Sequence, residues 1–261
     1  MEIIGKGFIA GRASEYFGAQ HPHATLIAAG VSSVYLTDAA AFEREAKLVY
    51  EVIRHCKAEG RTAVFLSTAA AGMYGAEDSP GTEEGPVFPE THYGRHKLAL
   101  EAVFAASGVR WLGLRLTHIV GQRQVAHQLL PSLTRQLLTG KVTVYSGASR
   151  DLLDIDHLMR AVDLLLARDV CDEIVNIASG QPEDIERIVD GLEQRLGTHA
   201  ERTLVHGKPA KRSIASIAKL RKLAPEIDDF GFGPGYLAAL LDRYVDDLAA
   251  HAYKELARSG Q

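Results

Sequence analysis

The sequence predicts an α/β fold in which a parallel sheet carries helices on both faces. Short apolar runs alternate with longer segments whose apolar residues recur at helical spacing. Strands that alternate with helices in this way are typical of a parallel sheet covered on both sides. At 261 residues, the chain is long enough for one large domain, or for one domain with a small appended lobe.

Composition narrows the class of protein. A hydrophobic content of 46% and a charged content of 24% are typical of globular proteins. The net charge of -4 argues against a nucleic acid or a membrane surface as partner. Cys56 and Cys171 have no metal or redox spacing, which suits a reducing compartment. Because no apolar run approaches the about 18 residues of a membrane span, and Met1 leads directly into a strand, we expect a cytoplasmic protein.

The first expected elements are a strand, a glycine turn and a helix. Glu2-Ile3-Ile4 forms the strand, and Gly5 to Ala10 (GKGFIA) has the pattern G-x-G-x-x-A before a helix that runs to about Phe17. Between a strand and a helix, this pattern favours binding of a pyrophosphate by backbone N–H groups. A tight turn without a ligand is the alternative.

The later elements follow from the same patterns of apolar runs and helical periodicity. We expect strands within 24–30, 63–66, 111–116, 142–145 and 173–177. We expect helices at about 39–57, from Thr91 onward, and at 129–138, 157–168, 183–196, 214–223 and 235–256.

A proton-transfer site is expected where the strand 63–66 stops at Ser67 and Thr68. The helix that follows carries Tyr93 and Lys97 one turn apart on the same face. An ammonium group beside the phenol would favour the phenolate and lower a pKa that is ordinarily about 10. Taken alone, the pair also fits a helix with a half-buried tyrosine and a solvated lysine, so the order of the surrounding motifs decides the interpretation.

Those motifs follow one another along nearly the whole chain. They are GKGFIA at 5–10, Ile27-Ala28-Ala29, Ser67-Thr68 with Met73-Tyr74-Gly75, the stretch from Pro89 to Lys97, LRLTHIVG at 114–121, the stretch from Val144 to Asp156, and VNIASG at 175–180. In this order they resemble the motifs of the extended short-chain dehydrogenase/reductase family, which includes nucleotide-sugar epimerases, dehydratases and ketoreductases.

The resemblance implies a Rossmann-like core and a small C-terminal substrate lobe. Residues 1–125 would form the core, with later strands from 142–180, and 126–141 with 181–261 would mainly form the lobe. NAD or NADP would bind at Gly5, Gly7, Phe8, Ile9, Ala10, Ala28 and Ala29. A nucleotide-sugar would contact His118, Arg150 and Tyr74. His118 stands where the family usually has Asn.

The resemblance also assigns the chemistry. Tyr93 would be the catalytic acid/base, Lys97 its pKa-setting and ribose-contacting partner, and Thr68, or else Ser67, the hydroxyl that binds the reacting oxygen. No metal site is expected, because His21 and His23 have no third ligand in sequence.

One departure from the family pattern concerns the cofactor. Only about sixteen residues separate GFIA from Ile27, where the family usually has two further strands and a helix that bind the adenosine. We therefore expect a Rossmann-like parallel sheet shortened by about two strands. The strand Glu2–Ile4 should then be an edge, covered by a partner subunit, as in a homodimer, or by another part of the chain.

Two functions remain open from the sequence. The first is an NAD(P)-dependent oxidoreductase or epimerase-type enzyme acting on a nucleotide-sugar or a related keto substrate. Ketoreduction is favoured over epimerisation, because epimerisation requires the cofactor to stay bound through two half-reactions. The second is a cofactor-free descendant of the family that performs non-redox proton transfer, as an isomerase, lyase or cyclase, or that acts as a binding subunit.

Overall fold

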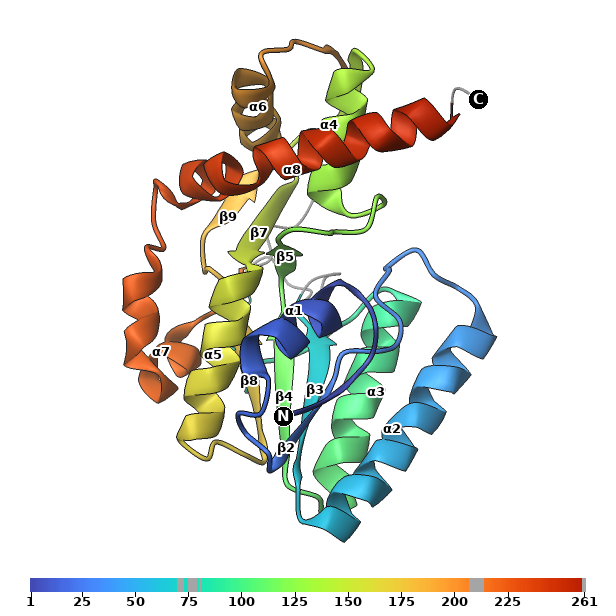
Figure 1. Cartoon of the computed structure of the whole chain (residues 1–261), viewed down its shortest axis with the longest axis vertical. Helices are drawn as coiled ribbons and strands as arrows, with labels where there is room; N and C mark the ends of the chain where they lie inside the picture. Colours follow the sequence, from blue (N-terminus) through green and yellow to red (C-terminus); the bar gives the residue numbers. More distant parts are fainter. Residues whose placement is uncertain (70–72, 75–78, 80, 207–213, 260–261) are drawn as a thin grey trace.

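The structure is a computed structural model that describes residues 1–69, 73–74, 79, 81–206 and 214–259. Gly75, part of the motif with Met73 and Tyr74, lies outside the described residues. Figure 1 shows a core built on a sheet and a smaller lobe above it.

The core sheet has five parallel strands in the order β1-β2-β3-β4-β8. They are β1 (Glu2–Ile4), β2 (Ala24–Ile27), β3 (Thr62–Thr68), β4 (Trp111–Leu116) and β8 (Glu173–Ile177). In the described part of the chain β1 pairs only with β2, so it is an edge strand, as the shortened glycine-turn region predicts. The predicted α/β fold class is therefore confirmed.

Helices cover both faces of this sheet (Figure 1). On one face α1 (Phe8–Phe17) contacts α5 (Ile155–Ala167), and on the other α2 (Ala39–Glu59) contacts α3 (His92–Ser107). Each face has its own apolar cluster, because each strand sends alternate side chains to opposite sides.

The start of α3 is fixed by a side-chain cap. Thr91 has an extended backbone, and its hydroxyl oxygen accepts a hydrogen bond from the N–H of Gly94 at 3.0 Å. The helix predicted to begin near Thr91 is therefore confirmed, and the cap sets the direction in which Tyr93 and Lys97 leave the helix.

Within the described residues, the upper lobe contains two small sheets and three helices around a separate apolar cluster. Its elements are β5 (His118–Val120), α4 (Leu129–Leu138), β6 (Lys141–Tyr145), β7 (Ser149–Asp154), β9 (Pro182–Asp184), α6 (Ile185–Leu196), β10 (Glu201–Val205) and α8 (Tyr236–Ser259). Beside the core, α7 (Ala218–Leu223) is followed by a 3-10 helix (Pro225–Phe230).

Residues 142–180, from which later core strands are expected, contain strands of more than one sheet. Of the strands in this range, β8 alone joins the core sheet, while β6 pairs with β10 and β7 lies between β5 and β9. These pairings join segments far apart in the sequence, so no local pattern distinguishes a lobe strand from a core strand.

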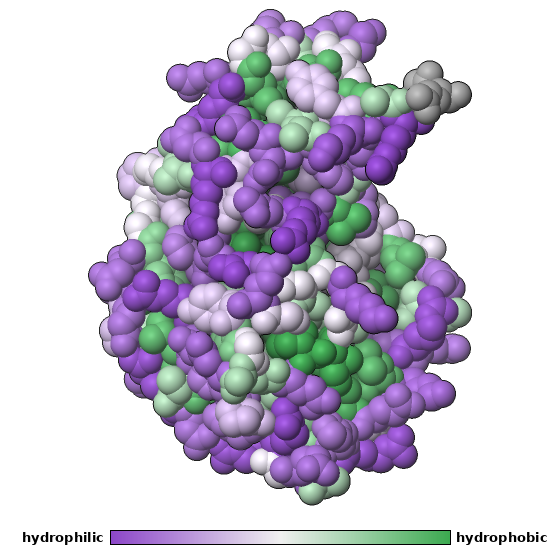
Figure 2. Space-filling model, viewed as in Figure 1, coloured by the Kyte–Doolittle hydropathy of each residue, from purple (hydrophilic) through white to green (hydrophobic). Residues whose placement is uncertain are grey.

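The face drawn in Figure 2 shows apolar surface gathered over the core, whereas the lobe above it is largely polar. An exposed apolar patch is the kind of surface that a partner covers. The homodimer and the covering of β1 remain predictions.

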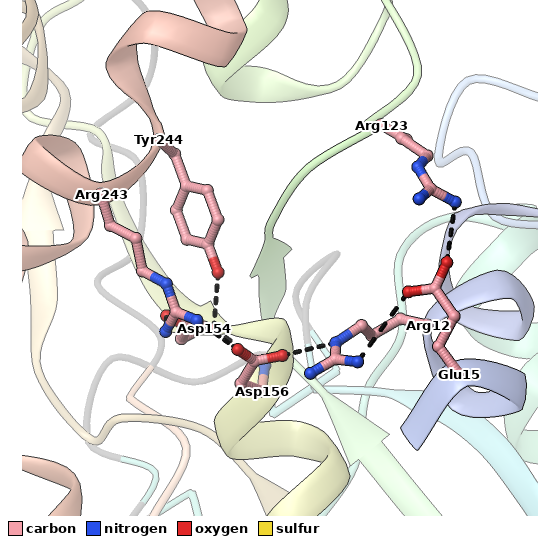
Figure 3. Close-up of polar contacts among 7 residues, drawn as sticks. All are labelled: Arg12, Glu15, Arg123, Asp154, Asp156, Arg243 and Tyr244. Carbon is pink, nitrogen blue, oxygen red and sulfur yellow. Dashed lines mark hydrogen bonds and ion pairs between the residues drawn. The ribbon is translucent and has the colours of Figure 1, made fainter. Parts of the chain in front are cut away.

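A cluster of charged side chains joins the core to the lobe (Figure 3). Asp156, in the first turn of α5, accepts a hydrogen bond from Arg12 Nε of α1 at 2.6 Å and another from Arg243 of α8. Asp154, which is buried, accepts from Arg243 Nη1 at 2.8 Å and from the Tyr244 hydroxyl at 2.9 Å. The N-terminus of α5 is thus the point at which α1 and α8 are held together.

We expect Asp156→Asn to lower the free energy of unfolding by about 1 kcal/mol at pH 7, since solvent screens a partly exposed pair. Burial raises the pKa of Asp156, but the hydrogen bond from Arg12 and the charges of Arg12 and Arg243 outweigh it, so the pKa lies below its ordinary value. Such a carboxyl stabilises the fold above its ordinary pKa of about 4, and this contribution is lost as the pH falls through the lowered value.

Urea unfolding between pH 3 and pH 7 measures this effect. The difference between the wild type and Asp156→Asn should shrink toward pH 3, and the exposed Asp246→Asn on α8 should show little difference at either pH. A difference of equal size at both ends would contradict the assignment.

Candidate active site

The structure brings Tyr93, Lys97 and Thr68 together at the carboxyl end of β3. The Tyr93 phenol, 9% exposed, forms a hydrogen bond with the Thr68 side chain. The Lys97 ammonium lies 4.9 Å from the ring centroid of Phe65 and 5.8 Å from that of Tyr93. It donates to the Leu66 carbonyl oxygen at 3.0 Å. The predicted grouping of a phenol, an ammonium group and a strand-end hydroxyl is therefore present.

The expected acidity of the phenol is wrong. Burial raises the pKa of Tyr93 to about 12; the hydrogen bond with Thr68 acts in the opposite direction, and the negative charge of Glu45 adds to the rise. Lys97 does not offset burial, because its ammonium donates to Glu45 Oε1 at 2.6 Å and forms a buried ion pair. Tyr93 is therefore a protonated phenol at neutral pH.

Glu45 is the residue at this site that sequence reasoning missed. It lies on the buried side of α2 with Val49, Val52, Ile53 and Cys56. An acidic residue in register with an apolar helix stripe is a signal that could have drawn attention to it, because an unpaired buried carboxylate is costly. The sequence alone does not reveal its partner, which lies on another helix.

Ser67 and Tyr74 are turned away from this site into a buried polar network. The Ser67 hydroxyl donates to Glu101, whose carboxylate pairs with Arg115 at 2.8 Å. Arg115 Nη1 donates to the Tyr74 hydroxyl at 3.2 Å, and that hydroxyl donates to Asn176. A buried ion pair needs such hydrogen bonds. Neither hydroxyl is therefore available for the roles expected of it, the reacting oxygen for Ser67 and the substrate for Tyr74.

The glycine turn brings β1 close to the end of β2. A Cβ on Gly5, whose φ is +139°, would lie 2.3 Å from the Ala28 carbonyl oxygen. Gly7 is the N-cap of α1 and has no side chain to cap the helix. The first helical hydrogen bond runs from Gly11 N–H to the Gly7 oxygen at 2.9 Å, which leaves the N–H groups of 8–10 without partners inside the helix.

The other residues expected near a cofactor lie around this turn. Phe8 lies beside the backbone of Gly121, where an added Cβ would come within 3.1 Å of its ring. Ile9 and Ala10 pack toward the core, and Ala28 and Ala29 are half-buried just after β2. These residues therefore line the glycine turn.

His118 and Arg150 lie on neighbouring strands of the lobe, β5 and β7. Burial, and then the charge of Arg150, lower the pKa of His118 to about 4, so its imidazole is neutral. Burial also lowers the pKa of Arg150, opposed by Tyr35, and Arg150 Nη1 donates to the Ser149 carbonyl oxygen at 2.7 Å. No carboxylate in the described ranges lies within ion-pair distance of Arg150, which leaves its guanidinium suited to an anion.

A cavity of about 270 Å³ lies between α1, the start of α5 and α8 (Figure 3). It is lined by Phe8, Arg12, Glu15, Gln122, Arg123, Ile155, Asp156, Arg243 and Tyr244. Arg123 reaches across it to Glu15, at 3.0 Å. Its charged side chains pair with one another, so the cavity belongs to the junction between core and lobe.

The described residues contain no group of three His, Cys, Asp or Glu side chains placed to hold a metal ion. Within those residues, too, no helix has the length and apolar character needed to cross a bilayer.

Several solved structures share this fold. RMD from Pseudomonas aeruginosa complexed with NADPH superposes with a TM-score of 0.79 at 20% identity, over 95% of this chain and 98% of that one. A UDP-galactose 4-epimerase gives 0.78 at 19% identity, over 96% and 99%. UDP-glucuronic acid 4-epimerase from Bacillus cereus, in complex with UDP-glucuronic acid and NAD, gives 0.74 at 21% identity, over 92% and 78%.

At these identities the structural likeness concerns the fold, and no curated protein sequence matches the chain. The sequence itself carries the family assignment. The profile of the NAD dependent epimerase/dehydratase family matches residues 10–178, which is more than half of the chain. The chain therefore belongs to the NAD dependent epimerase/dehydratase family.

Proposed function

We propose that this protein is an NAD(P)-dependent enzyme that reduces the keto group of a nucleotide-linked sugar. The observation that carries this proposal is the protonated phenol of Tyr93, hydrogen-bonded to Thr68 at the carboxyl end of β3 and next to Lys97. In open α/β sheets, ligands bind at the carboxyl ends of the strands.

The residues present fit most of a dinucleotide. The close approach of Gly5 to Ala28 and the uncapped N-terminus of α1 suit a diphosphate. Lys97 uses two of its three N–H groups on Glu45 and Leu66, so one remains for a ribose hydroxyl. The described residues do not supply a binding site for the adenosine, because no strand in the described ranges lies beyond β1.

Bound NAD(P)H would supply the hydride, and the protein would supply the proton. Thr68 would hold the substrate oxygen, and Tyr93 would donate its phenolic proton to that oxygen as the alcohol forms. A phenol that carries its proton at neutral pH suits this reductive step. Reduction is favoured over epimerisation because epimerisation requires the cofactor to stay bound through two half-reactions, and no strand in the described ranges flanks the adenosine.

Two residues of the lobe suit a substrate that carries a diphosphate. The Arg150 guanidinium can form paired hydrogen bonds with phosphate oxygens. The imidazole of His118, on the strand next to that of Arg150, is neutral. It can therefore donate a hydrogen bond to a sugar hydroxyl, or accept one from it, without adding charge. The Bacillus cereus relative, whose structure holds UDP-glucuronic acid, offers a parallel for such a ligand.

A second candidate is the cofactor-free descendant, which would perform non-redox proton transfer or serve as a binding subunit. Two observations favour it: β1 is an edge strand, so no described strand flanks the adenosine side, and the charge of Lys97 is taken up by Glu45. Cofactor binding therefore separates the two candidates.

We expect the wild type to bind NADPH or NADH with a dissociation constant below about 1 mM. Gly7→Asp should weaken this binding at least about tenfold, because its carboxylate would cap α1 and repel the phosphates. An added Cβ at Gly7 meets nothing within 4 Å, so the variant should fold.

Fluorescence titration of the reduced cofactor measures both affinities. Gly235→Asp, the same change just before α8, has equally open space and should bind like the wild type. Absence of binding by the wild type would reject the redox function in favour of the cofactor-free candidate.

We expect Tyr93→Phe to lower kcat for reduction by about 10²- to 10⁴-fold, the usual contribution of a positioned acid.

Because the pKa of Tyr93 is about 12 and that of His118 about 4, neither group changes charge between pH 6 and 9, so the wild-type kcat should be nearly flat over that range. Turnover with a panel of nucleotide-diphosphate keto-sugars measures both effects. Tyr50→Phe, on the exposed side of α2, is the matched control. Unchanged turnover in Tyr93→Phe would remove its assigned role.

A further inference from the structure

One buried carboxylate on α2 joins that helix to two other segments of the candidate active site. Glu45, with a side chain that is 0% exposed, accepts hydrogen bonds from Lys97 Nζ at 2.6 Å, from His96 Nε2 at 3.1 Å and from the Val31 N–H at 3.0 Å. These partners lie on α3 and on the loop after β2. Gly30 makes room for this contact, because an added Cβ there would lie 2.3 Å from Glu45 Oε1.

Stability alone is a weak reason for this arrangement. Removing a carboxylate and an ammonium group from water is costly, and well-packed apolar side chains often serve stability equally well. A buried ion pair does, however, hold its groups in one geometry. Here the Glu45 and Leu66 oxygens take two of the three N–H groups of Lys97 and so fix the direction of the third.

The same carboxylate fixes the backbone beside the cofactor turn. The Val31 N–H bond anchors the chain immediately after Ala28 and Ala29, and Ala28 is the residue that Gly5 approaches. One side chain on α2 therefore positions both Lys97 and the backbone that Gly5 approaches. None of the residues expected at the site lies on α2.

We propose that Glu45 is a positioning residue of this enzyme: it orients the Lys97 ammonium and the loop after β2, and its negative charge acts on the Tyr93 phenol. The proposal rests on the proposed function for its meaning in catalysis. The geometry of the carboxylate and its charge can be tested separately.

Three substitutions separate geometry from charge. Glu45→Asp keeps the charge but is too short to reach Lys97, His96 and Val31 together. Glu45→Gln keeps the length and removes the charge. Glu43→Gln is the matched control, because Glu43 is exposed on the same helix and no contact of its side chain with the site is seen in the described residues.

We expect Glu45→Asp to raise the KM for NADPH about tenfold while kcat changes less than threefold, and to leave the titration of Tyr93 unchanged. Glu45→Gln should shift that titration to lower pH, because Glu45 raises the pKa of Tyr93. The ultraviolet absorbance of phenolate, compared with and without Tyr93→Phe in each background, isolates this one tyrosine and requires no cofactor. A merely structural role would lower thermal stability without either effect.

The outcomes are distinguishable. Wild-type KM in Glu45→Asp together with a wild-type tyrosine titration in Glu45→Gln would overturn the proposal. If the wild type does not bind NADPH, the proposed function fails, and the tyrosine titration then decides whether the charge of Glu45 acts on Tyr93. Should Glu45→Gln fail to fold, the KM of Glu45→Asp is the deciding result, and a wild-type value overturns the proposal.

Discussion

The ion pair between Lys97 and Glu45 is the interaction on which the arrangement of the candidate active site depends. It joins α2 to α3 beneath the carboxyl end of β3, in a place from which water is excluded. Because neither charge can be left alone there, the two helices are restricted to one relative position. The charge of the Lys97 ammonium is thereby compensated, and the phenol beside it stays protonated at neutral pH.

A second constraint acts between the core and the lobe. The start of α5 receives guanidinium groups from both sides, Arg12 from the core and Arg243 from the lobe. The strands that carry His118 and Arg150 belong to the lobe, whereas Tyr93 and Thr68 belong to the core. Contacts near α5, on the opposite face of the sheet from α3, therefore help to hold the groups suited to a phosphate in place relative to the phenol.

Much of the core could be predicted from the sequence because its signals are local. A hydroxyl before a helix, a glycine after a strand and an apolar run between turns each act over a few residues, and they located α3, the glycine turn and the core strands. The lobe sheets could not be assigned, since β6 finds its partner about sixty residues later in β10. For the same reason the sequence did not show that Ser67 faces Glu101, or that Glu45 reaches Lys97.

The short edge strand β1 has a consequence for the dynamics of the N-terminus. In the described part of the chain its three residues pair only with β2, so they can open at a lower free-energy cost than the central strands β3 and β4. Their amide hydrogens should therefore exchange with solvent earliest among the core strands. Opening of β1 would carry the glycine turn with it. A ligand held at that turn would then draw the local equilibrium toward the closed strand, and affinity at the turn and order at the N-terminus would rise and fall together.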